Sequence, residues 1–164
     1  MALQAVYRDG LKNPASQHRA GRHSRRLLEN CRESIGLGVA AHLADTHADR
    51  IIFTSGGTEA NNLAIQGICG SHKTPGRIVI SGIEHPSVSS TASYLALGGW
   101  DLQITNTLPN GELDLEHFAS LVNPDTYLAC VMLANNETGV IQPLQEVVSI
   151  CAEHGCGVHT DAVQ

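Results

Sequence analysis

The feature that most constrains this chain is a regular alternation, from Arg50 onward, between short apolar runs and amphipathic stretches. Runs rich in β-branched and aromatic residues predict strands at 50–55, 77–82, 101–106, 127–135 and 155–160. The stretches between them predict helices at 59–69, 86–97, 114–122 and 144–155. Short strands alternating with helices are typical of consecutive βαβ units, whose strands run parallel with right-handed crossovers. We therefore expect an α/β fold with a predominantly parallel sheet and helices on both faces.

The first part of the chain has a different pattern. A stretch with apolar residues at helical spacing begins after Pro14 and predicts one long helix over about 16–43. We expect an N-terminal helical segment over residues 1–45 and the α/β domain over residues 46–164. The chain has 164 residues, of which 42% are hydrophobic, enough for a packed core of ordinary domain size.

Ligands of parallel α/β sheets bind beyond the carboxyl ends of the strands, so polar residues that follow a predicted strand are candidates for a site. After the strand at 50–55 the sequence reads GGTEANN, in which Gly57 and Thr58 open a predicted helix. A helix N-terminus with free N–H groups and a close backbone approach is suited to a phosphate. No P-loop lysine follows these glycines, which favours a cofactor phosphate over a nucleoside triphosphate. The alternative is an ordinary strand–turn–helix with Thr58 as the N-cap.

His85 follows the predicted strand at 77–82 and precedes a predicted helix. An imidazole there can stack on a flat ring or move protons near neutral pH, and the alternative is a surface histidine at a helix cap. Asn135 and Asn136 stand at the end of the apolar strand at 127–135. Because buried polar groups need partners and asparagine is also a turn residue, we expect one of the two to be structural and the other to hydrogen-bond a ligand.

Asp161 follows the last predicted strand, where a carboxylate costs stability unless it meets a cation or strong donors. The protonated ring nitrogen of a pyridine is such a partner, and a carboxylate facing it keeps the ring an electron sink. His159 lies two residues earlier on the same face and is a secondary candidate. The alternative for Asp161 is a cap of the next segment. Together, the strand ends carry a phosphate seat, an aromatic ring, an amide and a carboxylate, which are parts suited to a flat, anionic, pyridinium-type cofactor.

Several ordered segments carry a resemblance to a known family: NPASQHRAG, TSGGTEANNLAI, EHPSV, LANNETGVIQPL and HTDAVQ. They resemble the cysteine desulfurases and selenocysteine lyases, pyridoxal-phosphate enzymes of the aminotransferase class V group. The resemblance covers about 13–164 and implies part of a three-layer large domain of fold type I. It implies pyridoxal 5'-phosphate as cofactor and conversion of L-cysteine to L-alanine, with the sulfur transferred as a persulfide.

The same resemblance implies roles for single residues. Gly57 and Thr58 would bind the cofactor phosphate, and Asp161 would pair with the ring nitrogen. His85 would stack on the ring and assist proton transfers, as the catalytic residue. The two residues implied to reach the ring hydroxyl are Asn136 and Gln164. The resemblance also implies cysteine or selenocysteine as substrate, a homodimer, and a sulfur-acceptor or iron–sulfur scaffold protein as a partner in iron–sulfur cluster assembly.

The family's Schiff-base lysine and nucleophilic cysteine have no counterpart in this sequence. Its only lysines, Lys12 and Lys73, do not match the family's position, and the family's small C-terminal domain is absent. We therefore expect this chain alone to be inactive and to bind the cofactor without a covalent link. The alternative is a non-catalytic module of the same fold that binds a phosphorylated ligand or a partner protein.

Charge, hydropathy and cysteine content argue against other classes. The net charge of −6 argues against a nucleic-acid partner, and no apolar stretch is long enough to cross a membrane. Five cysteines at irregular spacing are not a disulfide framework and are typical of a reducing cytoplasm. One segment has a spacing that resembles a metal site, formed by Cys151, His154, Cys156 and His159. A helix that ends where a strand begins would separate these side chains, so we expect no metal there.

Overall fold

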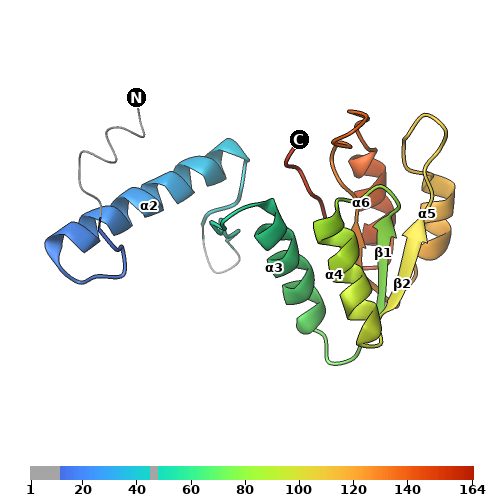
Figure 1. Ribbon diagram of the computed structural model, residues 1–164, viewed down its shortest axis with the longest axis horizontal. Helices are drawn as coiled ribbons and strands as arrows, with labels where there is room; N and C mark the ends of the chain where they lie inside the picture. The colour runs from blue at the N-terminus through green and yellow to red at the C-terminus, as the bar shows by residue number, and fades with distance from the viewer. Residues whose placement is uncertain (1–11, 45–47) are drawn as a thin grey trace. The chain divides into compact units, whose positions relative to one another are not determined.

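The computed structural model describes residues 12–44 and 48–164 (Figure 1). The chain forms two compact units, residues 1–53 and residues 54–164. The predicted boundary between residues 45 and 46 lies outside the described residues and stays a prediction. Within the described ranges, no helix combines the length and apolar character needed to span a membrane.

The first unit contains the long helix α2, over Arg19–Gly38. This helix is shorter than the predicted range of 16–43. It ends because Ala40 adopts a left-handed backbone conformation (φ 54°), which turns the chain back on itself. The Ala41 N–H then donates to the Gly36 carbonyl at 2.8 Å, so a carbonyl of the last helical turn is satisfied without further helix.

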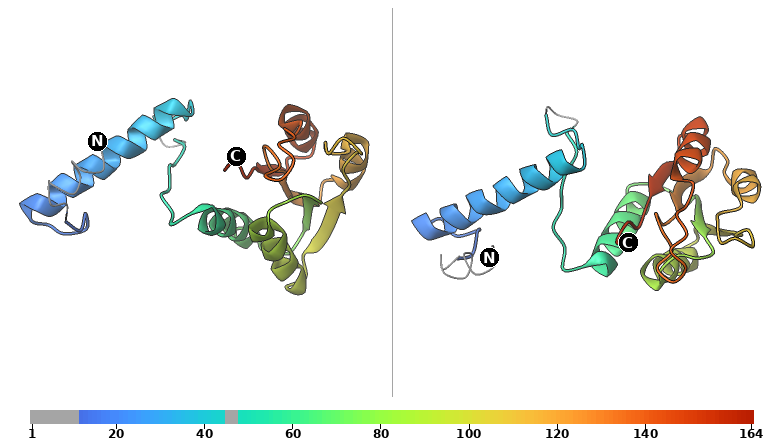
Figure 2. Two further views of the ribbon diagram at one scale, coloured as in Figure 1. Left: turned by 45° about the horizontal axis from the view of Figure 1, so that its top comes forward. Right: turned by 90° about the horizontal axis from the view of Figure 1, so that it is seen from above.

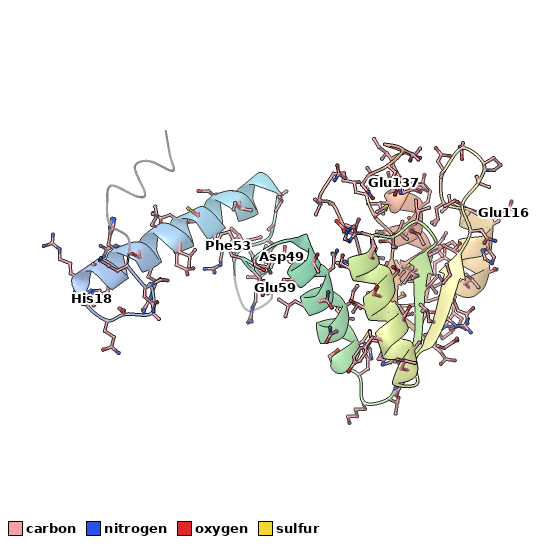
Figure 3. The ribbon with its side chains drawn as sticks, in the orientation of Figure 1. His18, Asp49, Phe53, Glu59, Glu116 and Glu137 are labelled. Carbon is pink, nitrogen blue, oxygen red and sulfur yellow. The ribbon has the colours of Figure 1, made fainter. Side chains whose placement is uncertain are left out.

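The predicted strand at 50–55 is wrong, because residues 48–54 have no regular secondary structure. A β-branched run forms a strand only where a neighbouring strand pairs with its backbone. Here the Ile51 carbonyl accepts a hydrogen bond from Arg32 Nε at 2.8 Å instead. The same guanidinium lies over the ring of Phe53, 5.2 Å from its centroid. Phe53 is labelled in Figure 3. The segment is therefore held by a side chain of α2 and not by a sheet.

The second unit is built on a four-stranded sheet in which all strands are parallel. The strands are β1 (Arg77–Ser81), β2 (Asp101–Thr105), β3 (Thr126–Cys130) and β4 (Gly157–His159). Their order in the sheet is β2-β1-β3-β4. β2 therefore lies on one side of β1, and β3 and β4 lie on the other. Each strand overlaps a predicted range, and the prediction of a predominantly parallel sheet is confirmed.

Helices cover both faces of this sheet (Figure 2). They are α3 (Gly57–Gly70), α4 (Pro86–Leu97), α5 (Leu115–Leu121) and α6 (Leu144–Glu153). Because side chains alternate along a strand, Ile78 and Ile80 of β1 pack beneath α3 and α4, whereas Val79 packs beneath α5 and α6. All three side chains are almost fully buried. The predicted three-layer α/β architecture is confirmed.

The strand order places several loops at one edge of the sheet. The chain changes direction between β1 and β3, which is where open α/β sheets bind their ligands. The loops that follow β1, β3 and β4 all leave the sheet at its carboxyl edge. In Figure 3 the label Glu137 marks the loop that follows β3, and the label Glu59 marks the first turn of α3.

Candidate functional site

A cavity of about 310 Å³ opens at the carboxyl edge of the sheet. It is lined by the first turn of α3, the start of α4, and the segments that follow β3 and β4. Its lining residues are Gly57, Thr58, Asn61, His85, Ser87, Met132, Ala134, Asn136, Asp161, Val163 and Gln164. All six residues predicted for the site from sequence therefore line one cavity.

The first turn of α3 forms one side of the cavity. Gly56 is the N-cap and provides no side-chain hydrogen bond, so the interpretation of Thr58 as the N-cap is wrong. Thr58 is instead the second residue of the helix, among the N–H groups that no preceding helical turn can satisfy. A Cβ added to Gly57 would lie 3.0 Å from Val163 Cγ2, so glycine lets two walls of the cavity approach. This geometry is typical of an anion seat.

Glu59 does not occupy that seat. Its carboxylate accepts hydrogen bonds from the backbone N–H and the hydroxyl of Ser55, both at 2.6 Å. Both hydrogen bonds from Ser55 lower the pKa of this carboxyl, and the one from the side chain has the larger effect. The acidic side chain thus fixes the approach to α3 while its charge is directed at the preceding turn.

His85 combines the two roles that the sequence left open, because it caps α4 and also lines the cavity. Its Nδ1 accepts a hydrogen bond from the Ser87 backbone N–H at 3.1 Å and lies 2.8 Å from the Ser87 hydroxyl. An Nδ1 that accepts a hydrogen bond carries no proton, so the neutral ring carries its proton on Nε2. The cap therefore fixes the tautomer of the neutral ring, with Nε2–H left as a donor.

Asp161 is held by donors from two segments. Its Oδ2 accepts a hydrogen bond from Asn61 Nδ2 at 2.8 Å, and its Oδ1 accepts one from the Val163 N–H at 3.1 Å. The Leu133 N–H donates to the Asp161 carbonyl at 2.9 Å, which continues the pairing of β3 with β4 beyond the last strand residue. The carboxylate is therefore fixed in place while it still lines the cavity.

Asn61 and Ser87 are site residues that the sequence analysis missed. Asn61 is 4% exposed, and its Nδ2 donates to the Ser87 hydroxyl at 2.8 Å as well as to Asp161. A signal was present in the sequence, since Asn61, Ile65 and Cys69 recur every four residues on the buried face of α3. A polar residue on an apolar helical stripe must have a polar partner across the interface.

His159 is not one of the residues that line the cavity. Its Nε2 lies 3.1 Å from Asn61 Oδ1, so the ring is directed at α3. Burial lowers the pKa of this imidazole, and the charge of Asp161 partly opposes that effect. His159 is therefore linked to the cavity through Asn61, and its role as a secondary ligand contact stays a prediction.

The two asparagines after β3 lie in different surroundings. Asn135 Oδ1 accepts hydrogen bonds from Glu137 N–H at 3.0 Å and from Thr138 N–H at 2.9 Å, which stabilises the turn. Asn136 lines the cavity. The structural member of the pair is therefore Asn135, and Asn136 remains the candidate for a ligand contact.

Glu84 is a third residue that the sequence analysis missed. It is 9% exposed, and its Oε1 accepts hydrogen bonds from the Ser81 hydroxyl at 2.5 Å and from the Met132 N–H at 2.7 Å. Among the described residues, its Oε2 is the buried side-chain oxygen without a hydrogen-bond partner. Burial raises the pKa of this carboxyl, and the charge of Asp161 adds to the effect. Glu84 links β1 to β3 beneath the cavity.

The cysteines and histidines of the metal-like segment face different sides of the sheet. Cys151 and Cys156 belong to the core beneath α5 and α6, whereas His159 contacts Asn61 on the opposite face. In the described part of the chain, no group of three potential metal-binding side chains gathers.

Comparison with known proteins shows which family has this arrangement of residues. Residues 1–164 match the aminotransferase class-V family. The chain belongs to that family. Among curated proteins, this class-V chain is 37% identical to the cysteine desulfurase IscS of Dictyoglomus turgidum over 99% of its own length and 40% of the relative's. It is 40% identical to IscS of Methylococcus capsulatus over 93% of its length and 37% of the relative's.

Solved structures show the same relationship. A NifS-like protein superposes with a TM-score of 0.89 at 31% identity, covering 99% of this class-V chain and 44% of the other. SspA in complex with cysteine superposes with a TM-score of 0.82 at 28% identity, covering 95% and 44% respectively. The chain thus spans about 40% of the length of the curated relatives it matches.

Proposed function

We propose that the cavity binds pyridoxal 5'-phosphate. The observation that carries this proposal is that Thr58, at an open helix N-terminus, and Asp161, a carboxylate held by two donors, line the same cavity. The first offers N–H groups to a phosphate, and the second offers a negative charge to a protonated ring nitrogen. These residue types fit a flat cofactor that is anionic at one end and cationic at the other.

The remaining lining residues would complete the binding. Gly57 and Thr58 would hold the phosphate, and Asn136 and Gln164 would hydrogen-bond the ring hydroxyl. His85 would stack on the ring and assist proton transfers, and its neutral form would present Nε2–H as a donor because Nδ1 accepts the hydrogen bond of the helix cap. When bound, the cofactor supplies an electron sink for the substrate's reacting carbon.

We further propose that the protein to which these residues belong is a cysteine desulfurase acting in iron–sulfur cluster assembly in the cytoplasm. The IscS relatives and the cysteine held by the structural neighbour SspA support this substrate and reaction. L-cysteine would be converted to L-alanine while its sulfur passes to an acceptor thiol as a persulfide; selenocysteine is the alternative substrate. Five cysteines, all free in the structure, favour a reducing compartment.

One observation favours a second candidate, in which residues 1–164 act as a binding module without turnover. The chain has two lysines, and neither lines the cavity. Lys73 lies in the loop between α3 and β1. This loop leads into the amino end of β1, whereas the cavity lies at the carboxyl edge of the sheet. A covalent link to the cofactor from within this chain is therefore not expected.

The test is cofactor binding to the 164-residue chain. We expect reversible binding of pyridoxal 5'-phosphate by fluorescence titration, and no stoichiometric adduct by mass spectrometry after borohydride reduction. Asp161→Ala should weaken the affinity roughly tenfold or more, the loss of a hydrogen-bonded charge pair. Lys73→Ala is the matched control and should bind like the parent chain. Equal affinities of the two variants would refute the cofactor assignment, and a stoichiometric adduct with alanine release would refute the module.

A further inference from the structure

The side chain of Asn61 stands between an acid and a base. Its Nδ2 donates to Asp161 Oδ2 at 2.8 Å, and its Oδ1 lies 3.1 Å from His159 Nε2. The second amide hydrogen donates to the Ser87 hydroxyl at 2.8 Å. One buried amide thus connects α3 to the start of α4, to β4 and to the segment that follows β4.

The orientation of this amide follows from its neighbours. A carboxylate only accepts hydrogen bonds, so the nitrogen of Asn61 must face Asp161. The oxygen then faces His159, and since an amide oxygen only accepts, His159 must present Nε2–H to it. The imidazole is therefore hydrogen-bonded to a neutral group, although a carboxylate lies on the other side of that same group.

The other titratable groups around His159 do not replace Asp161 as its charged partner. Its in-register neighbour on β3, Cys130, is a thiol whose pKa burial raises well above the usual range, so it is uncharged at neutral pH. Helix α3 presents Asn61, and α4 presents His85 through Ser87. Glu84 is a carboxyl whose pKa is raised by burial and, to a smaller extent, by the charge of Asp161.

We propose that Asn61 is a positioning residue that separates Asp161 from His159, holding the carboxylate at the cavity and preventing a direct ion pair between the two. An ion pair would direct the carboxylate charge at His159, and less of it would act on a ligand in the cavity. The separation itself is a property of the free chain. Its benefit to a cationic ligand rests on the proposed function.

The first measurement uses the unaltered chain without cofactor. Long-range ¹H–¹⁵N spectra of the histidine rings should show neutral His159 as the Nε2–H tautomer at slightly alkaline pH. The Nδ1–H tautomer would overturn the proposal, because Asn61 Oδ1 would then have no donor in His159. This result does not depend on whether any variant folds.

The second measurement compares Asn61→Ala with Asn62→Ala. Asn62 is the next residue of α3, and its amide bonds to Thr58, Gln66 and Thr91 and not to Asp161 or His159. In Asn61→Ala the freed carboxylate and imidazole should pair directly, which raises the pKa of His159 by about 1 in an NMR titration. Asn62→Ala should leave it unchanged. An unchanged or lower pKa of His159 in a folded Asn61→Ala chain would refute the proposal.

Cofactor affinity separates this inference from the proposed function. If both hold, Asn61→Ala weakens binding of pyridoxal 5'-phosphate roughly threefold to tenfold, less than Asp161→Ala does. If Asp161→Ala leaves the affinity unchanged while the pKa of His159 still rises in Asn61→Ala, the proposed function fails and the separating role of Asn61 stands. If the pKa of His159 does not rise in Asn61→Ala while Asp161→Ala weakens cofactor binding, the separating role of Asn61 fails and the proposed function stands.

Discussion

At the scale of single residues, Glu84 is a buried acidic side chain whose hydrogen bonding is incomplete. Its carboxyl is buried beneath the cavity, one oxygen accepts two hydrogen bonds, and the other accepts none from the described residues. A buried, half-satisfied carboxylate costs free energy when it is charged. Burial is also the main reason that its pKa is raised. The stability of the fold should therefore depend on the protonation of this side chain.

We predict that Glu84 makes the chain less stable as the pH rises. Because its pKa is higher in the folded than in the unfolded state, the folded state holds more protons between those two values. The free energy of unfolding should fall from about pH 4.5, near the ordinary pKa of glutamate, up to the folded-state pKa. In Glu84→Gln this decline should be absent, as measured by urea denaturation at a series of pH values.

The matched control is Glu153→Gln, on the exposed last turn of α6. Its free energy of unfolding should follow that of the parent chain across the same pH range. Parallel curves for Glu84→Gln and the parent would contradict a raised pKa of Glu84 in the folded chain.

The residues that could be predicted from sequence differ in kind from those that could not. His85, Asn136 and Asp161 follow strands, and the rule that ligands bind beyond strand ends requires only a correct strand assignment. Asn61 lies inside a helix, and its role depends on Asp161, a residue 100 positions away. The apolar stripe of α3 indicates that Asn61 is buried, but its partner is a tertiary contact that no local window of sequence encodes.

At the scale of elements, the strand assignments succeeded where a partner strand exists. The runs at β1 and at residues 50–55 have similar β-branched compositions, yet only β1 pairs with neighbours on both sides. Composition measures how well a side chain fits a pleated surface, and it does not provide that surface. The end of α2 was missed for a different reason. Alanine favours the helix, so the residue type of Ala40 does not predict a left-handed conformation.

We predict that Ala40→Gly stabilises the C-terminal end of α2. Alanine at φ 54° has a Cβ close to the following carbonyl, and glycine removes that contact. The gain should be about 0.5–1 kcal/mol after the greater freedom of glycine in the unfolded chain is subtracted. Slower amide hydrogen exchange at Ala41 would report it. Ala20→Gly, inside the first turn of the same helix, should instead speed exchange in that turn.

We predict that the layer beneath α5 depends on Phe118, which is fully buried. Phe118→Ala leaves a cavity between α5 and the sheet and should lower the free energy of unfolding by about 3–5 kcal/mol. Tyr94→Ala on α4 serves as the control, because that ring is 66% exposed. Its loss should change stability by about 0.5 kcal/mol or less, and chemical denaturation of both variants provides the comparison.

At the scale of the whole molecule, the second unit presents apolar side chains on its surface. Leu97 is 88% exposed, Ile141 is 69% exposed, and Ile104 on β2 is 56% exposed. β2 and β4 are the edges of the sheet in the described part of the chain. Exposed apolar residues on an edge strand favour association with another chain.

We predict that the chain self-associates and that Ile104 contributes. Sedimentation velocity should show species larger than a monomer, with a proportion that rises with concentration. Ile104→Lys places a charge on the edge strand and should shift the distribution toward monomer, whereas Ile104→Val should leave it unchanged. A monomer at every concentration tested would contradict both this prediction and the homodimer implied by the family resemblance.

The hydrogen bond between Asn61 and Asp161 has a consequence for the order in which the chain is made. The two residues are 100 positions apart, so a ribosome working at about 5–20 residues per second adds the second roughly 5–20 s after the first. During that interval α3 and β1 can already exist, but the acid that completes the cavity does not. A nascent chain therefore contains the helix N-terminus proposed to hold a phosphate before it contains the carboxylate, and a ligand that needs both can be bound only after Asp161 has been added.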